Sequence, residues 1–314
     1  MVNNSINVLK AFLVLLVLLG HAIQFSYENH GLKFDDDNLF RLIYAFHMPL
    51  FISVSGYLYK MGRPENIRKY LKLTLVPFFA WGFIEYLFFY AGNEGVFGYL
   101  IKISINPDLG LWFLLALLQA VFIVELVGKY IRSENQIYYF IGIYAVLGGF
   151  SYTTGIKAVG INLLVWMGPF FVMGMYIKKY SENLNLKNDR TMFFLVFLAG
   201  MFLLMPYWRR TSSDVKSVGI YVEYLIIKYV VAIFCCLCVY INLNMLNFKN
   251  KLLEFIARNS LAFYAIQFPI FKITFFFNGQ MEYIALFFLV GGTSLIAIYI
   301  INKYRYVREI LFGR

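Results

Sequence analysis

The stretch NVLKAFLVLLVLLGHAIQF, residues 7–25, decides the fold class. It is apolar enough to cross a bilayer as a helix, for which about 20 residues suffice. Two ionisable residues interrupt it, Lys10 and His21, which are eleven positions apart. At about 100° per residue, both side chains lie on one helix face, roughly 16 Å apart along the axis. Because ionisable groups are costly in hydrocarbon, this pair indicates a function that involves both membrane surfaces.

The composition indicates a membrane protein over the whole chain. Of the 314 residues, 61% are hydrophobic and 14% are charged, which lies outside the range of soluble domains. Residues 1–314 are therefore predicted to form a single all-α polytopic membrane domain with no soluble appended domain. The first apolar run lacks a small-residue cleavage pattern and is predicted to be a retained helix. Three cysteines in one apolar run offer no metal-ligand spacing, so no metal site is predicted.

A window of about 19 residues predicts ten transmembrane helices. They cover residues 6–24, 39–60, 70–91, 109–129, 137–151, 160–178, 190–207, 219–243, 257–277 and 282–302. With the N-terminus inside, eighteen Lys and Arg fall in the inner loops and tail, against seven in the outer loops. Because cytoplasmic loops retain such residues, both termini are predicted to be cytoplasmic. The net charge of +11 follows from this bias and suits anionic lipid, so a bilayer is the predicted partner and nucleic acid is not.

This topology places two histidines at similar depth. The second predicted helix runs inward and contains His47, while His21 lies in the outer third of the first. Two histidines on adjacent helices, joined by a short outer loop, are expected to converge. The structural alternatives are that Lys10 reaches lipid phosphate with its charged end and that the histidines are hydrogen bonders in helix packing.

Four motifs carry a resemblance to a known family. They are LKAFLVLLVLLGHAI (9–23), FHMPLFISVSGYLY (46–59), LGLWFLLALL (109–118) and ARNSLAFYAIQFPI (257–270). In this order they resemble membrane-bound acyltransferase family 3, which includes bacterial O-acetyltransferases of lipopolysaccharide, capsule and nodulation sugars, and fucose 4-O-acetylase-like proteins. The resemblance covers nearly the whole chain.

The chain departs from that family's pattern at cationic and late positions. Lys10 replaces the Arg that precedes the family's histidine by eleven residues, and Lys69 and Lys72 stand where two arginines are usual. Lysine keeps the charge but lacks the planar fork of arginine. Gln267 stands where a late histidine is common; an amide donates and accepts hydrogen bonds but cannot shuttle a proton.

The resemblance implies acyl transfer, most often of acetyl from cytoplasmic acetyl-CoA, to a hydroxyl of a cell-surface or lipid-linked carbohydrate. It places the chain in the bacterial cytoplasmic membrane. The polyanionic donor is expected among Lys10, Arg68, Lys69 and Lys72. His21 is expected to act as base or to carry the acyl group itself. His47 is expected to orient His21, bind the acceptor or stabilise the oxyanion, and the sequence leaves these roles open.

Further polar residues extend the predicted site. Glu85 is predicted at the depth of the histidines, where it would hold a histidine tautomer or pair with Lys228; a purely structural ion pair is the alternative. Trp112 opens a helix at the outer interface, where aromatic-belt anchoring competes with sugar stacking.

The remaining polar residues are assigned more simply. Arg209 and Arg210 would bind an acidic glycan, a lipid-linked diphosphate or lipid headgroups, and Gln267 completes the predicted acceptor site. Gln119 and Glu125 are not on one face and receive no role.

Glycines within the predicted helices fit close helix approach. They are Gly56, Gly82, Gly142, Gly148, Gly149, Gly168 and Gly174.

Two other functional classes compete with the enzyme. In a polysaccharide exporter the histidines would line a substrate path without acyl transfer, and ten helices with polar residues at two depths suit that as well. The third functional class is a membrane anchor without activity. The enzyme is favoured because an exporter has no evident need for an inner polyanion site.

Overall fold

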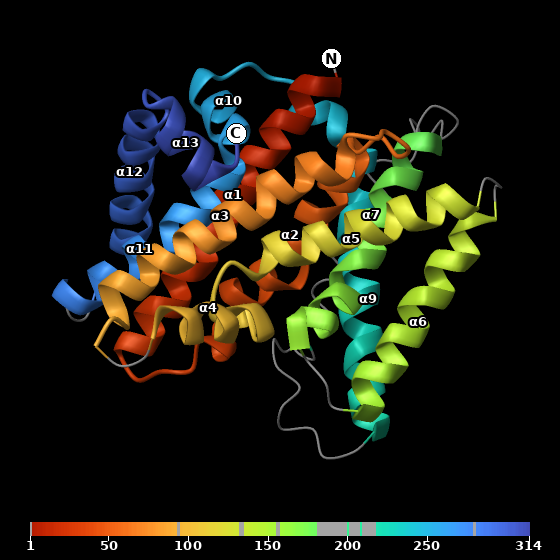
Figure 1. Cartoon of the computed structure of the whole chain (residues 1–314), viewed down its shortest axis with the longest axis horizontal. Coiled ribbons are helices and arrows are strands. Elements are labelled where there is room, and N and C mark those ends of the chain that lie inside the picture. Colours follow the sequence, from red (N-terminus) through yellow and green to blue (C-terminus); the bar gives the residue numbers. More distant parts are fainter. Residues whose placement is uncertain are drawn as a thin grey trace. The chain divides into compact units, whose positions relative to one another are not determined.

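The chain is all-helical wherever the computed structural model describes it, which is residues 2–92, 95–131, 135–154, 158–180, 200, 208, 218–278 and 281–314. The long helices are α1(Val2–Asn29), α2(Asn38–Leu58), α3(Asn66–Phe89), α5(Trp112–Tyr130), α6(Gln136–Thr154), α7(Ile161–Tyr180), α9(Val218–Ile241), α11(Ser260–Asn278) and α12(Tyr283–Ile301) (Figure 1). Short helices are α4(Val96–Ile105), α10(Lys251–Arg258) and α13(Arg305–Phe312). Single 3-10 turns are η1(Phe34–Asp36), η2(Pro107–Leu109), η3(Ala158–Gly160) and η5(Leu243–Leu246).

The predicted fold class is confirmed for this part of the chain. Six of its helices, α1, α2, α3, α5, α7 and α12, are long and apolar enough to cross a membrane. Helices α6, α9 and α11 coincide with three further predicted spans. The predicted span 190–207 lies outside the described residues except for position 200. The count of ten spans and the cytoplasmic side of the termini stay predictions.

The chain divides into two compact units, each built from two stretches of sequence. Unit 1 comprises Met1–Val54 and Lys178–Leu295, and unit 2 comprises Ser55–Ile177 and Ile296–Arg314. Each unit has its own packing, so the two are described in turn.

Helix α1 is the centre of unit 1. Helices α10 and α11 and the turn η5 pack along it, and Figure 1 shows α1 beside α11. Leu18 and Ala22 of α1 form a buried cluster with Phe271 of α11 and with Leu286 and Val290 of α12. Leu18 and Ala22 are four residues apart, as are Leu286 and Val290, so one face of α1 is covered by apolar side chains.

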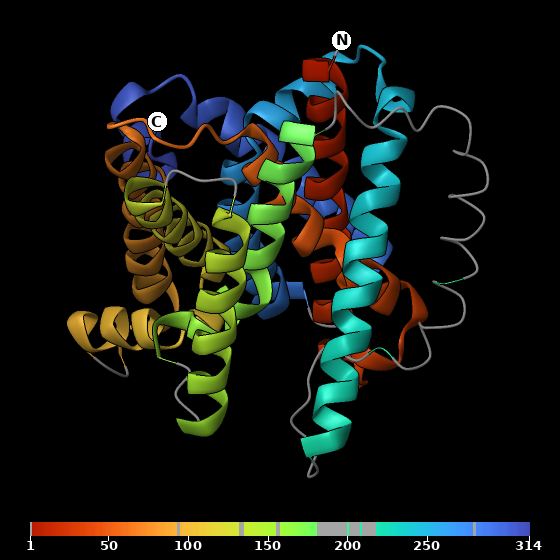
Figure 2. The same ribbon diagram turned by 90° about the vertical axis from the view of Figure 1, so that its right-hand side faces the viewer.

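Helix α9 adds a second apolar cluster to unit 1. Val231 and Cys235 pack with Ala45 of α2 and with Trp208. All three cysteines of α9 are buried. Figure 2 shows the last turns of α9 and the first turns of α1 at one end of the molecule, where η5 contacts α1.

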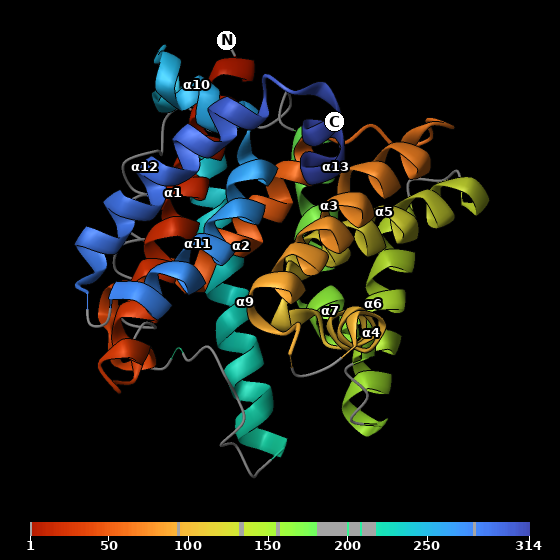
Figure 3. The same cartoon turned by 60° about the vertical axis from the view of Figure 1, so that its left-hand side comes forward.

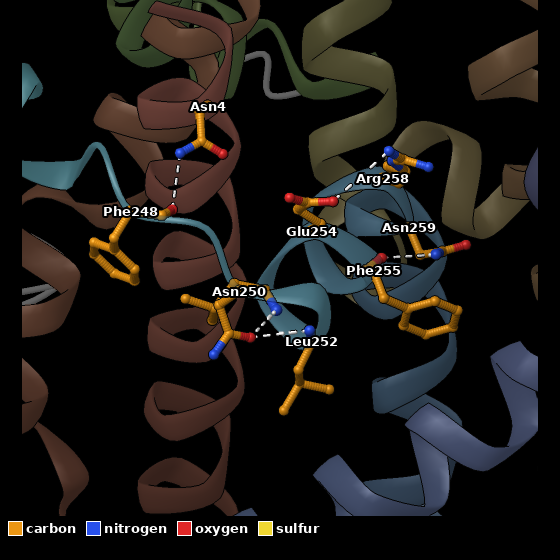
Figure 4. Close-up of polar contacts among 9 residues, drawn as sticks. Asn4, Phe248, Asn250, Leu252, Glu254, Phe255, Arg258 and Asn259 are labelled. Carbon is orange, nitrogen blue, oxygen red and sulfur yellow. Dashed lines mark hydrogen bonds and ion pairs between the residues drawn. The ribbon is translucent and has the colours of Figure 1, made fainter. Parts of the chain in front are cut away.

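Side-chain amides fix the start of α1 and the start of α10 (Figure 4). Asn250 caps α10, because its carbonyl oxygen accepts from the amides of Leu252 and Leu253 at 2.9 and 3.1 Å. Asn4 Nδ2 donates to the carbonyl oxygen of Phe248 at 2.8 Å. The segment that leads into α10 is thereby tied to the first turn of α1.

Helix α3 is the centre of unit 2. Helices α4, α5 and α13 pack on it, and Figure 3 shows α13 beside α3. The indole nitrogen of Trp81 donates to the carbonyl oxygen of Leu311 at 2.8 Å. Gly313 has a φ of +69°, and a methyl group there would lie 2.7 Å from the Cα of Leu73. The end of α13 is therefore in close contact with α3.

The glycine prediction is confirmed at some positions and wrong at others. A methyl group at Gly56 would lie 2.7 Å from the carbonyl carbon of Phe171 in α7, and one at Gly82 would lie 2.5 Å from Ile103 in α4. Gly168 lies against the ring of Tyr144. At Gly142 and Gly149 no atom of the described chain lies within 4 Å of a methyl group, because these two face away from their own unit.

Candidate functional site

His21 lies in unit 1 at the contact between α1 and α11. It is half-buried, and its ring meets the edges of Phe268 and Phe271 with centroid distances of 5.8 and 6.2 Å. On α1 the buried apolar cluster has members on both sides of His21, with Leu18 before it and Ala22 and Phe25 after it. The imidazole is thus held by aromatic rings within an apolar helix contact.

His47 is held in one orientation by its own helix. The side chain is 2% exposed, and Nδ1 lies 2.7 Å from the carbonyl oxygen of Ile43. A carbonyl only accepts, so Nδ1 carries the hydrogen in the neutral ring and the lone pair is on Nε2. The backbone of α2 therefore sets the tautomer that accepts a proton at Nε2.

Tyr44 connects the helix segments that carry the two histidines. Its ring contacts His47 edge-on at 4.7 Å and covers Gly20, where a methyl group would lie 2.7 Å from its Cε2. Its hydroxyl donates to Gln24 Oε1 at 3.4 Å. Tyr44 was not among the site residues predicted from the sequence, although its position three residues before His47 puts both on one face of α2.

Gln267 is buried in α11, one turn before Phe271. It is 1% exposed, and its Nε2 has no hydrogen-bond acceptor among the described residues. Buried amides are normally satisfied, since each unmade hydrogen bond costs free energy. The predicted acceptor-site residue is therefore a buried donor on the helix that contacts His21.

The predicted donor residues are divided between the two units. Lys10 is half-buried on α1 of unit 1. Arg68, Lys69 and Lys72 are exposed on α3 of unit 2, and their spacing of three and four gathers them on one side of that helix. Each group has the charge that a polyanionic donor requires.

A carboxylate from α13 contacts the last of these basic residues. Lys72 Nζ lies 3.5 Å from Glu309 Oε2, and Arg305 Nε donates to Glu309 Oε1 at 3.0 Å. The hydrogen bond from Arg305, together with the charge of Lys72, lowers the pKa of the Glu309 carboxyl below its usual value. Both sites are solvent-exposed, so the pair is weak in free energy and screened by salt.

The other predicted residues have different surroundings. Glu85 is 5% exposed in α3 and belongs to unit 2, whereas the histidines and Lys228 belong to unit 1. Trp112 begins α5, half-buried, with its ring against Phe113. The predicted roles of these residues stay predictions.

Two predicted residues, Arg209 and Arg210, lie outside the described residues. One further residue that the sequence analysis gave no role, Glu125 of α5, is the acceptor of a hydrogen-bond cluster in unit 2.

Comparison with known proteins gives a family match over residues 3–303, to a family described as "Acyltransferase domain". A 49-residue segment is 45% identical to the nodulation protein NolL of Sinorhizobium fredii (strain NBRC 101917 / NGR234). That segment covers 16% of this chain and 13% of NolL. No solved structure matches the chain.

Proposed function

Because the chain belongs to the acyltransferase family matched over residues 3–303, we propose that it transfers an acyl group, most often acetyl, from cytoplasmic acetyl-CoA to a hydroxyl of a cell-surface or lipid-linked carbohydrate. In this proposal it acts as a multi-pass protein of the bacterial cytoplasmic membrane. The nodulation protein NolL, which shares the 49-residue segment, supports membership of the family and leaves the acceptor to be identified.

The contact of Tyr44 with His47 and with Gly20, the neighbour of His21, is the observation that supports the proposal. The ring of Tyr44 covers Gly20, the neighbour of His21, and contacts His47. The carbonyl of Ile43 fixes which nitrogen of His47 can accept a proton. An acceptor hydroxyl needs a base, which is the role proposed for His21, because the hydroxyl is a poor nucleophile while protonated.

The proposed reaction balances as a thioester-to-ester exchange. A histidine takes the hydroxyl proton as the oxygen attacks the thioester carbonyl carbon, the C–O bond forms, and the C–S bond breaks. The proton then goes to the departing thiolate of CoA. In the variant with an acyl-histidine, the His21 nitrogen attacks the thioester carbonyl carbon, the C–S bond breaks, and the CoA thiolate leaves with the imidazole proton. The sugar oxygen then attacks the acyl carbonyl carbon, the C–N bond breaks, and the hydroxyl proton goes to the released imidazole. The donor amide of Gln267 is suited to the negative oxygen that develops in either route.

Acceptor recognition is assigned to the outer side of the chain. Trp112 would stack on a sugar ring, and Arg209 with Arg210 would bind an acidic or diphosphate group. The proposed phosphate-binding cations for the donor are Lys10 in unit 1 and Arg68, Lys69 and Lys72 in unit 2, since phosphate prefers such cations.

The experiment is the O-acetyl content of the surface glycan, measured by NMR before and after mild base in a deletion strain. The strain is complemented with wild type, His21→Ala, His47→Ala or His30→Ala at matched membrane levels. His30 is the matched control, because it is the third of three histidines and lies in the turn after α1, with Nδ1 2.7 Å from the carbonyl oxygen of Ser26.

Base-labile acetyl restored by wild type and His30→Ala, but absent with His21→Ala, is the expected result. Glycan export is measured in the same strains. Loss of export in the deletion strain with no acetyl difference would refute acyl transfer and favour an export protein.

A further inference from the structure

A carboxylate on α5 gathers three donors from the turn that joins α2 to α3. Tyr59 follows α2, and its hydroxyl donates to Glu125 Oε1. The amide of Asn66, the first residue of α3, donates to the same oxygen at 2.7 Å. The backbone amide of Gly62 lies 3.1 Å from Oε1 and 3.3 Å from Oε2. One side chain therefore binds the start, the middle and the end of this turn.

The two side-chain donors of this cluster are buried, whereas Gly62 is exposed. Tyr59 is 6% exposed and Asn66 is 5% exposed. The ring of Tyr59 packs against Tyr70 at 5.6 Å and Phe171 at 5.3 Å. Buried polar groups cost free energy unless they are hydrogen-bonded. Removing the acceptor would deprive the buried Tyr59 hydroxyl of this bond, whereas the Asn66 amide would keep its bond to the carbonyl oxygen of Lys60 at 2.8 Å.

The backbone of the turn depends on the same contact. Gly62 has a φ of +83°, in the left-handed region that favours glycine. Met61 packs on α5 three residues beyond Glu125, where a methyl group at Gly128 would lie 2.7 Å from its sulfur. Hydrogen bonds and apolar packing thus fix this turn against α5.

The cluster sets the rotation of the first turns of α3. Asn66 faces α5 and is buried, whereas Arg68 and Lys69 are exposed, because residues two and three positions further along a helix point about 160° and 60° away from it. Turning Asn66 away from Glu125 would redirect both basic side chains together.

We propose that Glu125 is a positioning residue of the donor site, which holds the α2–α3 turn so that Arg68 and Lys69 face the phosphate groups of the acyl donor. This inference rests on the proposed function, because it assigns those cations to the donor. Three neutral groups donate hydrogen bonds to the Glu125 carboxylate, which leaves the positive charges of Arg68 and Lys69 for an incoming anion.

The test uses the purified full-length protein and coenzyme A itself as the probe, with affinity measured by isothermal titration calorimetry. Glu125→Ala is expected to raise the Kd for coenzyme A about tenfold, and Glu125→Gln, which retains an acceptor oxygen, about threefold. Glu65→Gln is the matched control, since Glu65 is an exposed carboxylate of the same turn. It is expected to leave the Kd unchanged.

Two further measurements separate positioning from general loss of structure. Tryptic cleavage after Lys60, which is exposed, reports on the turn directly and is expected to be faster in Glu125→Ala. In a background with both Arg68→Ala and Lys69→Ala, Glu125→Ala is expected to change the Kd by less than about twofold, because Glu125 acts through these two basic residues. Tyr59→Phe keeps the ring packing and serves in place of Glu125→Ala if that variant does not fold.

The results distinguish the positioning role of Glu125 from the assignment of the donor site. Faster cleavage with an unchanged Kd would overturn the positioning role, and so would unchanged cleavage. Full additivity with the Arg68→Ala and Lys69→Ala pair would also overturn it, since Glu125 would then act elsewhere. A wild-type protein that does not bind coenzyme A would refute the donor assignment of the proposed function instead.

Discussion

Replacing Gly56 with alanine tests the closest helix contact of unit 2. The added methyl group would lie 2.7 Å from the carbonyl carbon of Phe171, against 3.4–4 Å for ordinary contact. The backbone of α7 must therefore retreat by at least about 0.7 Å, because a carbonyl cannot turn aside as a side chain can. Overpacking costs about 1–3 kcal/mol, and a backbone obstacle belongs at the upper end of that range.

The assay is thermal unfolding of the purified protein in detergent. A loss of about 3 kcal/mol, at roughly 2 °C per kcal/mol for a chain of this size, lowers the midpoint temperature by about 6 °C. Gly168→Ala is expected to lower it less, because the neighbour at Gly168 is the side chain of Tyr144, which can rotate. Gly142→Ala is the control, with no described atom within 4 Å, and gains helix propensity of up to about 1 kcal/mol. Equal midpoints for Gly56→Ala and Gly142→Ala would refute the reasoning.

Three further predictions concern pH, capping and the histidine pair. The pKa of Glu309 is lowered in the docked helix α13, so its contribution to docking is complete above the usual carboxyl pKa and disappears as the pH falls through the lowered value. Hydrogen-exchange protection of α13 is expected to drop in that acidic range for wild type and to stay flat for Glu309→Gln; equal profiles would contradict this. Asn250→Ala removes the cap of α10 and is expected to destabilise that helix by about 1 kcal/mol, seen as faster amide exchange at Leu252 and Leu253, with Lys249→Ala as control. Tyr44→Phe is expected to retain most O-acetylation, because ring contacts with His47 and Gly20 persist. Tyr44→Ala is expected to lose it at matched membrane level. Equal activity of the two variants would argue that the ring does not connect the helix segments that carry His21 and His47.

Local spacing predicted the parts of the site that belong to one helix. Lys10 and His21 share a face because α1 is one uninterrupted helix, from Val2 to Asn29, as the apolar run indicated. The predicted depth of His47 rests on the alternation of spans and stays a prediction. Its tautomer follows from the backbone carbonyl four residues earlier, and a sequence cannot say whether a histidine uses that bond or another.

Contacts between distant segments could not be predicted in the same way. Glu125 received no role because its partners Tyr59 and Asn66 lie 66 and 59 positions away, and no periodicity on one helix relates them. The glycines show the same limit. Gly56 and Gly142 both lie within predicted apolar helices, yet of these two only Gly56 faces another helix of its unit. Hydropathy separates apolar segments from polar ones, but it does not say which face of an apolar helix packs against another helix and which faces lipid.

The buried cysteines of α9 make the chain suited to mapping its own topology. Cys235 and Cys236 are 0% exposed and Cys238 is 4% exposed, so polar thiol reagents should pass over all three. A cysteine placed at an exposed position would then be the one that reacts, in an otherwise native sequence. Lys249→Cys and Lys33→Cys, on predicted inner and outer loops, should be labelled by an impermeant maleimide from opposite sides of the membrane. The orientation inferred from lysine and arginine counts thereby becomes a direct measurement, with no need to build a cysteine-less parent.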